Sequence, residues 1–397
     1  MPMPLNHGMR IDFPRDSIAR QDFIIDLRKF VLNDMAASLK RRFLAEIAPT
    51  FAAREGRTFA TEDEIHVEML PDAAFRLYSV VRYNAQEMSW SSVIPDVERQ
   101  IEDIRALIKK AIEPKAGINR PTGSLHLDPA LPIPENVEGH DVHLMPGGYV
   151  SDDPILSGAI YDNGLTVFTA GLLGADIDDI GQSMAHYIRC RFPELRPTAI
   201  LDCGCTIGHN TVPWATCFPD AKVFGVDVAG SALRYAHARA MSMGTAVHFH
   251  QMDATGLSFK DATFDLVFSS QFLHELSLED VGKYMAEAYR VLRPGGMLIT
   301  MELPPNRLLE PYDQFYLDWD AYYNNEPYYR ASRDADMGVI AERSGFRPKS
   351  YFQFTVSQYG KTSPEQFRAE VNSPAVLNGD TGRLSDDIRY FGFGLRK

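Results

Sequence analysis

The sequence TAILDCGCTIG, residues Thr198–Gly208, decides the fold of this chain. A short apolar run ends in an acid and then opens into a turn with two glycines, after which a helix is expected. Glycine suits such a turn because a backbone that passes through φ > 0, or that approaches a ligand closely, cannot carry a Cβ atom. Many turns between a strand and a helix are only structural, so the meaning of this pattern depends on the segments that follow it.

Apolar segments recur downstream, and each ends where a strand would meet a loop. They are Lys222–Val226 before Asp227, Val247–Met252 before Asp253, Phe264–Phe268 before Ser269, and Met297–Glu302. A helix is expected to begin at Ser277 and to end within Arg290–Gly296, because the proline and glycines of that segment stop helices. Apolar strands that alternate with helices predict a parallel sheet covered on both faces, which is a doubly wound α/β fold.

Asp227 stands at the end of its strand, about 19 residues after Gly208. Doubly wound nucleotide-binding folds place an acid at this spacing, where it accepts hydrogen bonds from ribose hydroxyl groups. The glycine turn and this acid together predict a site for a cofactor that contains a nucleoside.

In combination, these segments resemble the class I S-adenosylmethionine-dependent methyltransferases. The motifs that carry the resemblance are Leu201–Gly208, Val226-Asp227, Asp253-Ala254, Phe264–Val267 and Leu292–Gly296. It covers residues 160–305 well and residues 335–397 loosely. It implies a Rossmann-like, seven-stranded, mostly parallel sheet, and S-adenosylmethionine as a cofactor that leaves as S-adenosylhomocysteine. Thr206 departs from the family, which usually has a third glycine at that position.

The resemblance also implies the residues that bind the cofactor. They are Asp202, Gly204, Cys205, Gly208, Asp227, Val228, Asp253, Ala254, Ser270 and Tyr161. An NAD-dependent dehydrogenase is the nearest alternative on the same architecture, but its fingerprint is Gly-x-Gly-x-x-Gly. Three residues separate Gly204 from Gly208 here, so the methyltransferase cofactor is favoured.

Composition narrows the class of partner. The net charge of −13 and the lack of a basic stripe argue against a nucleic-acid substrate, because such proteins gather Lys and Arg to displace counterions. The four cysteines show no paired zinc spacing, and we expect them to be reduced. No apolar run is long enough for a membrane span and no signal peptide is recognised, so a cytoplasmic protein without a membrane partner is expected.

The chain is expected to divide into three parts. Residues 1–113 form a helical N-terminal domain, in which Ile24, Leu27, Val31, Met35, Leu39, Phe43 and Ile47 follow the spacing of one buried helix face. Residues 114–156 form a proline-rich but ordered connector. Residues 157–397 form the methyltransferase domain, with a cap inserted at about 306–333. A homodimer through the N-terminal region or through the aromatic cap is one possibility.

His274 follows the fourth strand, near the place where the methyl group should lie, and histidine titrates near neutral pH. We therefore predict His274 as the general base, with a purely structural role as the equal alternative. Aromatic residues predicted to contact the acceptor are Tyr149, Tyr316, Trp319 and Tyr323. No metal site is expected, because His126, His140 and His143 lie in a proline-rich segment without an acid cluster.

The sequence thus predicts an enzyme that transfers a methyl group from S-adenosylmethionine to a small, aromatic or largely apolar acceptor. Three alternatives stay open. The domain could methylate a protein side chain, could use the cofactor in another reaction such as a cyclisation or a decarboxylation, or could be a non-catalytic partner subunit. The intact set of Asp202, Gly204, Gly208 and Asp227 argues against the last.

Overall fold

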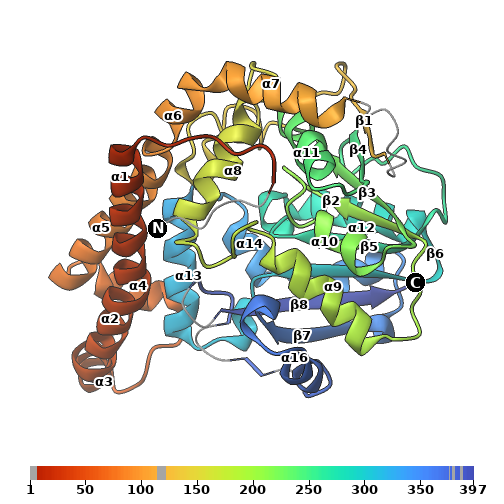
Figure 1. The fold of residues 1–397 in the computed structure, drawn as a ribbon. Coiled ribbons are helices and arrows are strands. Elements are labelled where there is room, and N and C mark those ends of the chain that lie inside the picture. The colour runs from red at the N-terminus through yellow and green to blue at the C-terminus, as the bar shows by residue number, and fades with distance from the viewer. Residues whose placement is uncertain (1–6, 114–121, 375, 378–380, 385–387) are drawn as a thin grey trace.

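A mostly parallel sheet lies at the centre of the computed structural model, which describes residues 7–113, 122–374, 376–377, 381–384 and 388–397 (Figure 1). In this part of the chain the sheet has eight strands in the order β1-β4-β3-β2-β5-β6-β8-β7. The strands are β1 (Ser124–His126), β2 (Ala199–Cys203), β3 (Lys222–Asp227), β4 (His248–Gln251), β5 (Phe264–Ser270), β6 (Leu292–Glu302), β7 (Tyr351–Ser357) and β8 (Arg389–Arg396). Only β8 runs antiparallel to its neighbours β6 and β7, which confirms the predicted doubly wound α/β class.

The described sheet has one strand more than the seven that were expected. The additional strand is β1, which comes from the proline-rich connector and forms the edge of the sheet, where it pairs in parallel with β4, Ser124 beside His248. The three residues of β1 are too short to give a recognisable strand pattern in the sequence. Residues 114–121 of the connector lie outside the described residues.

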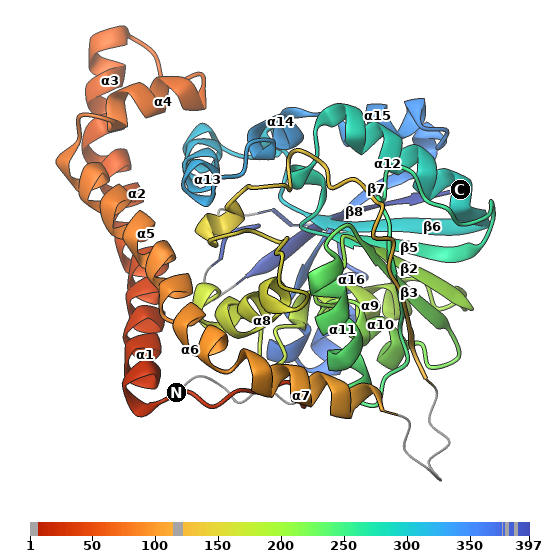
Figure 2. The same ribbon diagram turned by 90° about the horizontal axis from the view of Figure 1, so that it is seen from above.

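Helices cover both faces of the sheet (Figures 1 and 2). They are α8 (Leu156–Phe168), α9 (Asp179–Arg191), α10 (Val212–Cys217), α11 (Gly230–Ser242), α12 (Leu278–Val291), α15 (Met337–Arg343) and α16 (Pro364–Val371). α12 begins as predicted, because the Ser277 side chain accepts a hydrogen bond from the Asp280 backbone N–H at 3.2 Å. Its buried residues, Val281, Tyr284, Met285 and Ala288, recur at helical spacing and join the core under the sheet.

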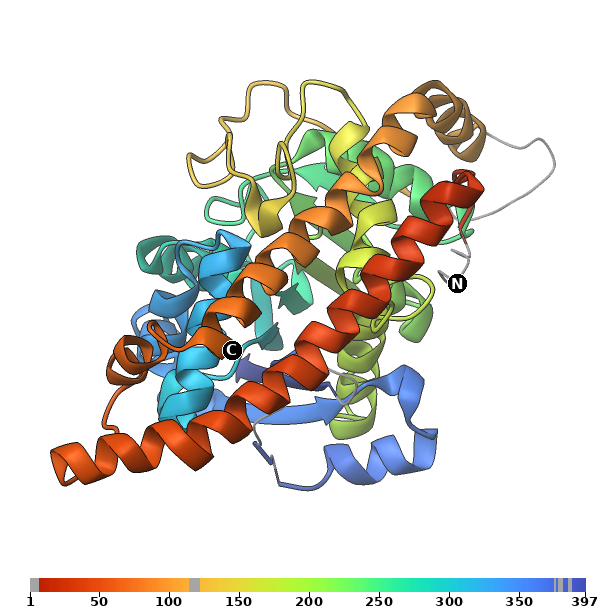
Figure 3. The same ribbon diagram turned by 90° about the vertical axis from the view of Figure 1, so that its left-hand side faces the viewer.

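The N-terminal region begins with one long helical rod, visible in Figure 3 as a diagonal. It consists of α1 (Arg15–Lys29), η1 (Phe30–Met35), α2 (Ala36–Arg42), η2 (Phe43–Ile47) and α3 (Ala48–Glu55), in which η1 and η2 are π-helical. The predicted apolar face is largely buried, since Ile24, Val31, Leu39 and Phe43 are each at most 4% exposed. From Val31 onward this face repeats every four residues, a spacing wider than that of an α-helix, and the wider π turns accommodate it.

The rest of the N-terminal region and the cap pack together. The helices of the region are α4 (Glu62–Met69), α5 (Ala73–Ser91), α6 (Ile94–Arg99) and α7 (Ile101–Ile112), and those of the cap are α13 (Pro311–Asn324) and α14 (Tyr329–Asp334). Figure 2 shows α13 between the N-terminal helices and the sheet. The hydroxyl groups of Tyr78 and Tyr316 are 3.0 Å apart, and Arg330 pairs with Asp63 at 2.8 Å. The N-terminal helices and the cap therefore share one core.

Short helical turns complete the described chain, namely the 3-10 helices η3 (Val142–Leu144), η4 (Leu273–Glu275), η5 (Asn306–Leu308), η6 (Pro348–Ser350) and η7 (Tyr359–Lys361). Within the residues that the structure describes, no helix combines the length and the apolar character needed to cross a membrane.

Candidate active site

The glycine turn leaves the carboxyl end of β2 and needs its glycines for two reasons. Gly204 and Gly208 have φ angles of +72° and +70°, in the left-handed region that favours glycine. A Cβ atom on Gly204 would also lie only 2.4 Å from the ring of Phe272. Thr206, the position at which the resembled family has a glycine, is likewise left-handed, with φ of +47°. The departure noted in the sequence is thus a residue held in a conformation that glycine would adopt without strain.

Asp227, at the end of β3, fastens this turn. Its carboxylate accepts the backbone N–H of Thr206 at 2.8 Å and that of Ala229 at 2.9 Å. Burial raises the pKa of Asp227, and these backbone hydrogen bonds act against the increase. The acid therefore lies beside the turn, as the predicted ribose contact requires, and it also stabilises the left-handed residue.

Asp202 lies at the end of β2 and is 1% exposed. Its carboxylate accepts a hydrogen bond from Thr211 Oγ1 at 2.5 Å, while burial raises its pKa to about 8. A cation bound next to this group would favour the charged carboxylate. The sulfonium and ammonium groups of S-adenosylmethionine are cations of this kind.

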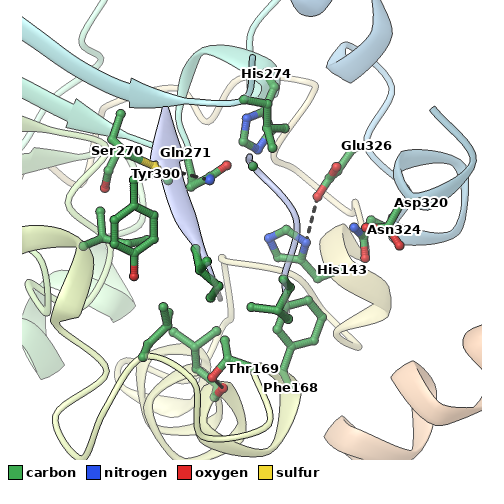
Figure 4. Close-up of a pocket in the computed structure, with 18 of the residues that line it drawn as sticks. His143, Phe168, Thr169, Ser270, Gln271, His274, Asp320, Asn324, Glu326 and Tyr390 are labelled. Carbon is green, nitrogen blue, oxygen red and sulfur yellow. Dashed lines mark hydrogen bonds and ion pairs between the residues drawn. The ribbon is translucent and has the colours of Figure 1, made fainter. Parts of the chain in front are cut away.

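A pocket of about 1350 Å³, a volume that includes its open mouth, extends from the glycine turn towards the cap (Figure 4). Sequence-predicted residues that line it are Asp202, Gly204, Cys205, Ser270, Tyr161, Tyr149, His274 and Tyr316. These residues come from the strand ends, the connector, α8 and α13, so the fold brings together the cofactor motif and part of the predicted acceptor set.

Other predicted residues lie outside the described pocket lining, and their contacts explain why. Gly208 faces the ring of Phe249, and the Asp253 carboxylate accepts hydrogen bonds from Thr255. Val228 and Ala254 are likewise not among the lining residues, nor is Asp227. These five flank the carboxyl ends of β2, β3 and β4 and stay predictions for the cofactor.

Two aromatic residues of α13 turn away from the pocket lining. The indole N–H of Trp319 donates to Ser79 Oγ at 2.9 Å, and Tyr323 packs edge-on against Tyr83 with ring centroids 5.5 Å apart. The N-terminal helix α5 covers this side of α13, so the structure places Trp319 and Tyr323 in the packing of the cap rather than at the acceptor.

His274 is buried and forms an ion pair with Glu302, Nδ1 to Oε2 at 2.8 Å. The same carboxylate accepts the backbone N–H groups of Phe272 and Leu273 at 2.8 and 2.7 Å. Burial opposes the charged imidazole, but the carboxylates of Glu302, Glu326 and Glu275 together outweigh it and raise the pKa of His274 to about 10. His274 is therefore a cation at neutral pH, which disfavours the role of a general base while the pair is intact.

A second charged group lies next to His274. His143 Nδ1 is 3.0 Å from Glu326 Oε1, and His143 Nε2 is 4.0 Å from Glu275 Oε1. The Tyr149 hydroxyl donates to Glu275 at 3.4 Å, and burial raises the pKa of Glu275. The ligand atoms of His143, Glu275 and Glu326 lie within 4.8 Å of one another, so within the described part of the chain these three side chains could hold a cation.

Sequence reasoning missed the pocket residues that come from the N-terminal helices and the cap. They are Arg28, Leu32, Arg82, Leu317, Asp320, Asn324 and Glu326, and two further missed residues are His143 in the connector and Arg383 in the segment before β8. Arg28 gave a usable signal, because it stands four residues after Ile24 and three before Val31 on the predicted buried face. A charged residue on such a face is either paired or functional. The others have no local signal, since packing between distant segments brings them to the pocket.

Comparison with known proteins places the glycine turn in a known domain. Residues 200–296 match the family model described as a methyltransferase domain. A demethylmenaquinone methyltransferase of Thermus thermophilus is 36% identical over 112 residues, which are 28% of this chain and 50% of that protein. A malonyl-[acyl-carrier protein] O-methyltransferase of Hahella chejuensis is 33% identical over 142 residues, or 36% of this chain and 48% of that protein. The chain spans about half the length of the curated relatives it matches.

Solved structures align with more of the chain at lower identity. A crystal structure from Nostoc punctiforme, provisionally named as an O-methyltransferase, covers 96% of both chains at 14% identity with a TM-score of 0.44. The matched segment of residues 200–296 contains the glycine turn and Asp227, and it is this segment that carries the assignment. Residues 200–296 of the chain are therefore a methyltransferase domain of the class I S-adenosylmethionine-dependent type, and the cofactor of such domains is S-adenosylmethionine.

Proposed function

We propose that this protein transfers the methyl group of S-adenosylmethionine to a small-molecule acceptor bound in the pocket of Figure 4. One observation carries the proposal. The same pocket is lined at one end by the glycine turn of the methyltransferase segment and at the other by side chains of α1, α5 and α13, which lie outside that segment. A donor and an acceptor would thus share one cavity.

The walls of the pocket support a small acceptor with an apolar or aromatic body. Leu32, Leu165, Phe168, Tyr316 and Leu317 all line it, and side chains of this kind favour ligands that bury apolar surface. Side chains of the N-terminal helices and the cap form the walls of this end, which favours a small molecule over a protein side chain. The relatives include enzymes named as C-, N- and O-methyltransferases, so their names leave the acceptor atom open.

Methyl transfer requires mainly that the protein orient the donor and the acceptor. Methyl transfer from a sulfonium is an in-line displacement with the leaving group already present, and holding two reactants in line is worth roughly 7–11 kcal/mol. A base is needed only when the acceptor must lose a proton. In our proposal the charged His274 positions the acceptor, or pairs with an acceptor that has already lost its proton. His143 is then the second candidate for the base, because it lines the same pocket with Glu326 at 3.0 Å from its Nδ1.

Two variants and two ligands test the proposal. Gly204→Val should abolish the binding of S-adenosylhomocysteine, measured by calorimetry, because a branched side chain would meet both Phe272 and the ligand. Gly282→Ala is the matched control, because a Cβ atom at this position would lie in open space. This variant should bind S-adenosylhomocysteine as tightly as the wild type does. NAD should not bind. Failure of the wild type to bind S-adenosylhomocysteine would overturn the proposal.

Activity itself is measured with methyl-labelled S-adenosylmethionine and a panel of small aromatic and aliphatic acceptors. We expect label to move from the cofactor to at least one small molecule. Label found only on added protein substrates would favour the side-chain alternative, and consumption of the cofactor without methyl transfer would favour another reaction type. Size-exclusion chromatography with light scattering determines separately whether the chain forms a homodimer.

A further inference from the structure

Arg28 presents a buried charge to the acceptor end of the pocket. The residue is 2% exposed, lines the pocket, and lies on α1 with its guanidinium carbon 4.6 Å from the centre of the Phe168 ring. Its Nε has no hydrogen-bond partner in the part of the chain that the structure describes. Burial lowers the pKa of Arg28 to about 9, and the group is still a cation at neutral pH. Such a group is costly unless something pairs with it.

The nearby Arg82 shows what a satisfied guanidinium looks like in the same wall. It is also buried, at 3% exposure, but its Nε donates to Asp320 Oδ1 at 2.8 Å and another nitrogen pairs with that carboxylate at 2.5 Å. Arg82 also donates to Gln86. The negative charge of Asp320 favours the charged form of Arg28. The hydrogen bonds that the Asp320 carboxylate accepts, however, come from Arg82. This part of the wall thus has two guanidinium groups for one carboxylate.

A third cation completes this end of the pocket. The guanidinium of Arg383 lies 4.0 Å from the centre of the Tyr316 ring, and both residues line the pocket. Guanidinium groups pair with the planar oxygens of carboxylates and with phosphates, and aromatic rings beside them accept a flat apolar body.

We propose that Arg28 binds an oxyanion of the acceptor, so that the substrate of the proposed function is a small organic anion, a carboxylate or a phosphate with an apolar or aromatic body. This inference rests on the proposed function and narrows its substrate class. The carboxylate of the cofactor's methionine is the other possible source of an anion in this pocket. The neighbours of Arg28 disfavour it, because they come from α8, α5 and α13 and not from the glycine turn.

The test compares Arg28→Met and Arg28→Lys in the full chain with Arg20→Met, an exposed arginine on the same helix, as the control. Without ligands, Arg28→Met should unfold at a temperature equal to or above that of the wild type, because it removes a buried charge whose Nε has no hydrogen-bond partner among the described residues. A marked loss of thermal stability, with Arg20→Met unchanged, would show that Arg28 is structural and would overturn the inference.

The ligand arm uses benzoate, phenyl phosphate and benzyl alcohol as probes, each with protein saturated by S-adenosylhomocysteine. At least one anion should bind the wild type and Arg20→Met more tightly than the neutral alcohol does. It should bind Arg28→Met about 10- to 100-fold more weakly, with part of the affinity kept in Arg28→Lys. Equal binding of the anion to all variants, or no preference for an anion in the wild type, would overturn the inference.

The affinity for S-adenosylhomocysteine distinguishes the two possible anions, the oxyanion of the acceptor and the carboxylate of the cofactor. Calorimetry should give Arg28→Met an affinity for S-adenosylhomocysteine within about twofold of the wild type. A loss of cofactor affinity in Arg28→Met alone would assign Arg28 to the cofactor's carboxylate, which refutes this inference but leaves the proposed function standing. A wild type that binds no S-adenosylhomocysteine would instead refute the proposed function.

Discussion

The pair between His274 and Glu302 makes a quantitative prediction about stability and pH. Glu302→Gln keeps the size of the side chain but removes the charge that His274 faces at 2.8 Å. In the folded protein the pKa of His274 is about 10, compared with the ordinary value of 6.5. A group whose pKa is raised by folding stabilises the protein fully below its unfolded pKa, and this contribution is lost as the pH rises through the folded pKa.

The magnitude follows from linkage. With those two pKa values, the raised pKa of His274 contributes about 4 kcal/mol at pH 7 and about 1 kcal/mol at pH 9.5, and Glu302 is the first of the three carboxylates that raise it. Removing one partner of a buried ion pair costs about 3–5 kcal/mol, which agrees with the value at neutral pH. We therefore expect Glu302→Gln to be less stable than the wild type by about 3–5 kcal/mol at pH 7, and the gap to narrow by most of that amount at pH 9.5.

The assay is urea-induced unfolding, followed by circular dichroism, at several pH values between 6.5 and 9.5. Other titrating groups are common to both proteins and cancel in the difference. Glu365→Gln, an exposed acid on α16, is the control and should match the wild type throughout. A difference in the free energy of unfolding between Glu302→Gln and the wild type that is independent of pH would refute a charged His274. If the two proteins were equally stable at every pH, the ion pair would be refuted.

Three further changes are expected to have specific outcomes. Thr206→Gly should keep cofactor binding and should change the free energy of unfolding by no more than about 1 kcal/mol. The change is small because relief of the left-handed strain offsets the greater freedom of glycine in the unfolded chain. A large loss of cofactor affinity in the folded variant would show that the Thr206 hydroxyl contacts the cofactor. Asp227→Ala should weaken S-adenosylhomocysteine binding by roughly 1–3 kcal/mol in calorimetry, and unchanged affinity would remove Asp227 from the site. Exhaustive treatment with a chelator should leave methyl transfer unchanged, whereas loss and recovery with one divalent metal would identify the group of His143, Glu275 and Glu326 as a metal site.

The sequence predicts the cofactor half of the molecule well, for a physical reason. Strands and helices of a doubly wound sheet leave local patterns, and the left-handed turn at Gly204 favours glycine. The acceptor half depends on contacts between residues far apart in the chain, such as the hydrogen bond between Tyr78 and Tyr316. No local pattern reveals that α5 covers the side of α13 that carries Trp319.

The role of His274 was harder to predict for a similar reason. Its position after β5 is visible in the sequence, but its charge depends on Glu302, which stands at the end of the neighbouring strand β6. The pairing of these two strands brings the carboxylate to the imidazole. The pKa of a histidine in a loop depends on neighbours from other strands, which the local sequence does not show.

The two π turns of the N-terminal rod determine where its length can change. Each of η1 and η2 takes up an extra residue without rotating the helices on either side. Loss of one residue inside η1 would restore a regular α-helix and keep Arg28 and Leu39 facing their present neighbours. The same loss inside α1 would rotate everything before it by about 100° relative to the sheet. Homologous rods are therefore expected to differ in length at Phe30–Met35 and Phe43–Ile47, and to stay constant between them.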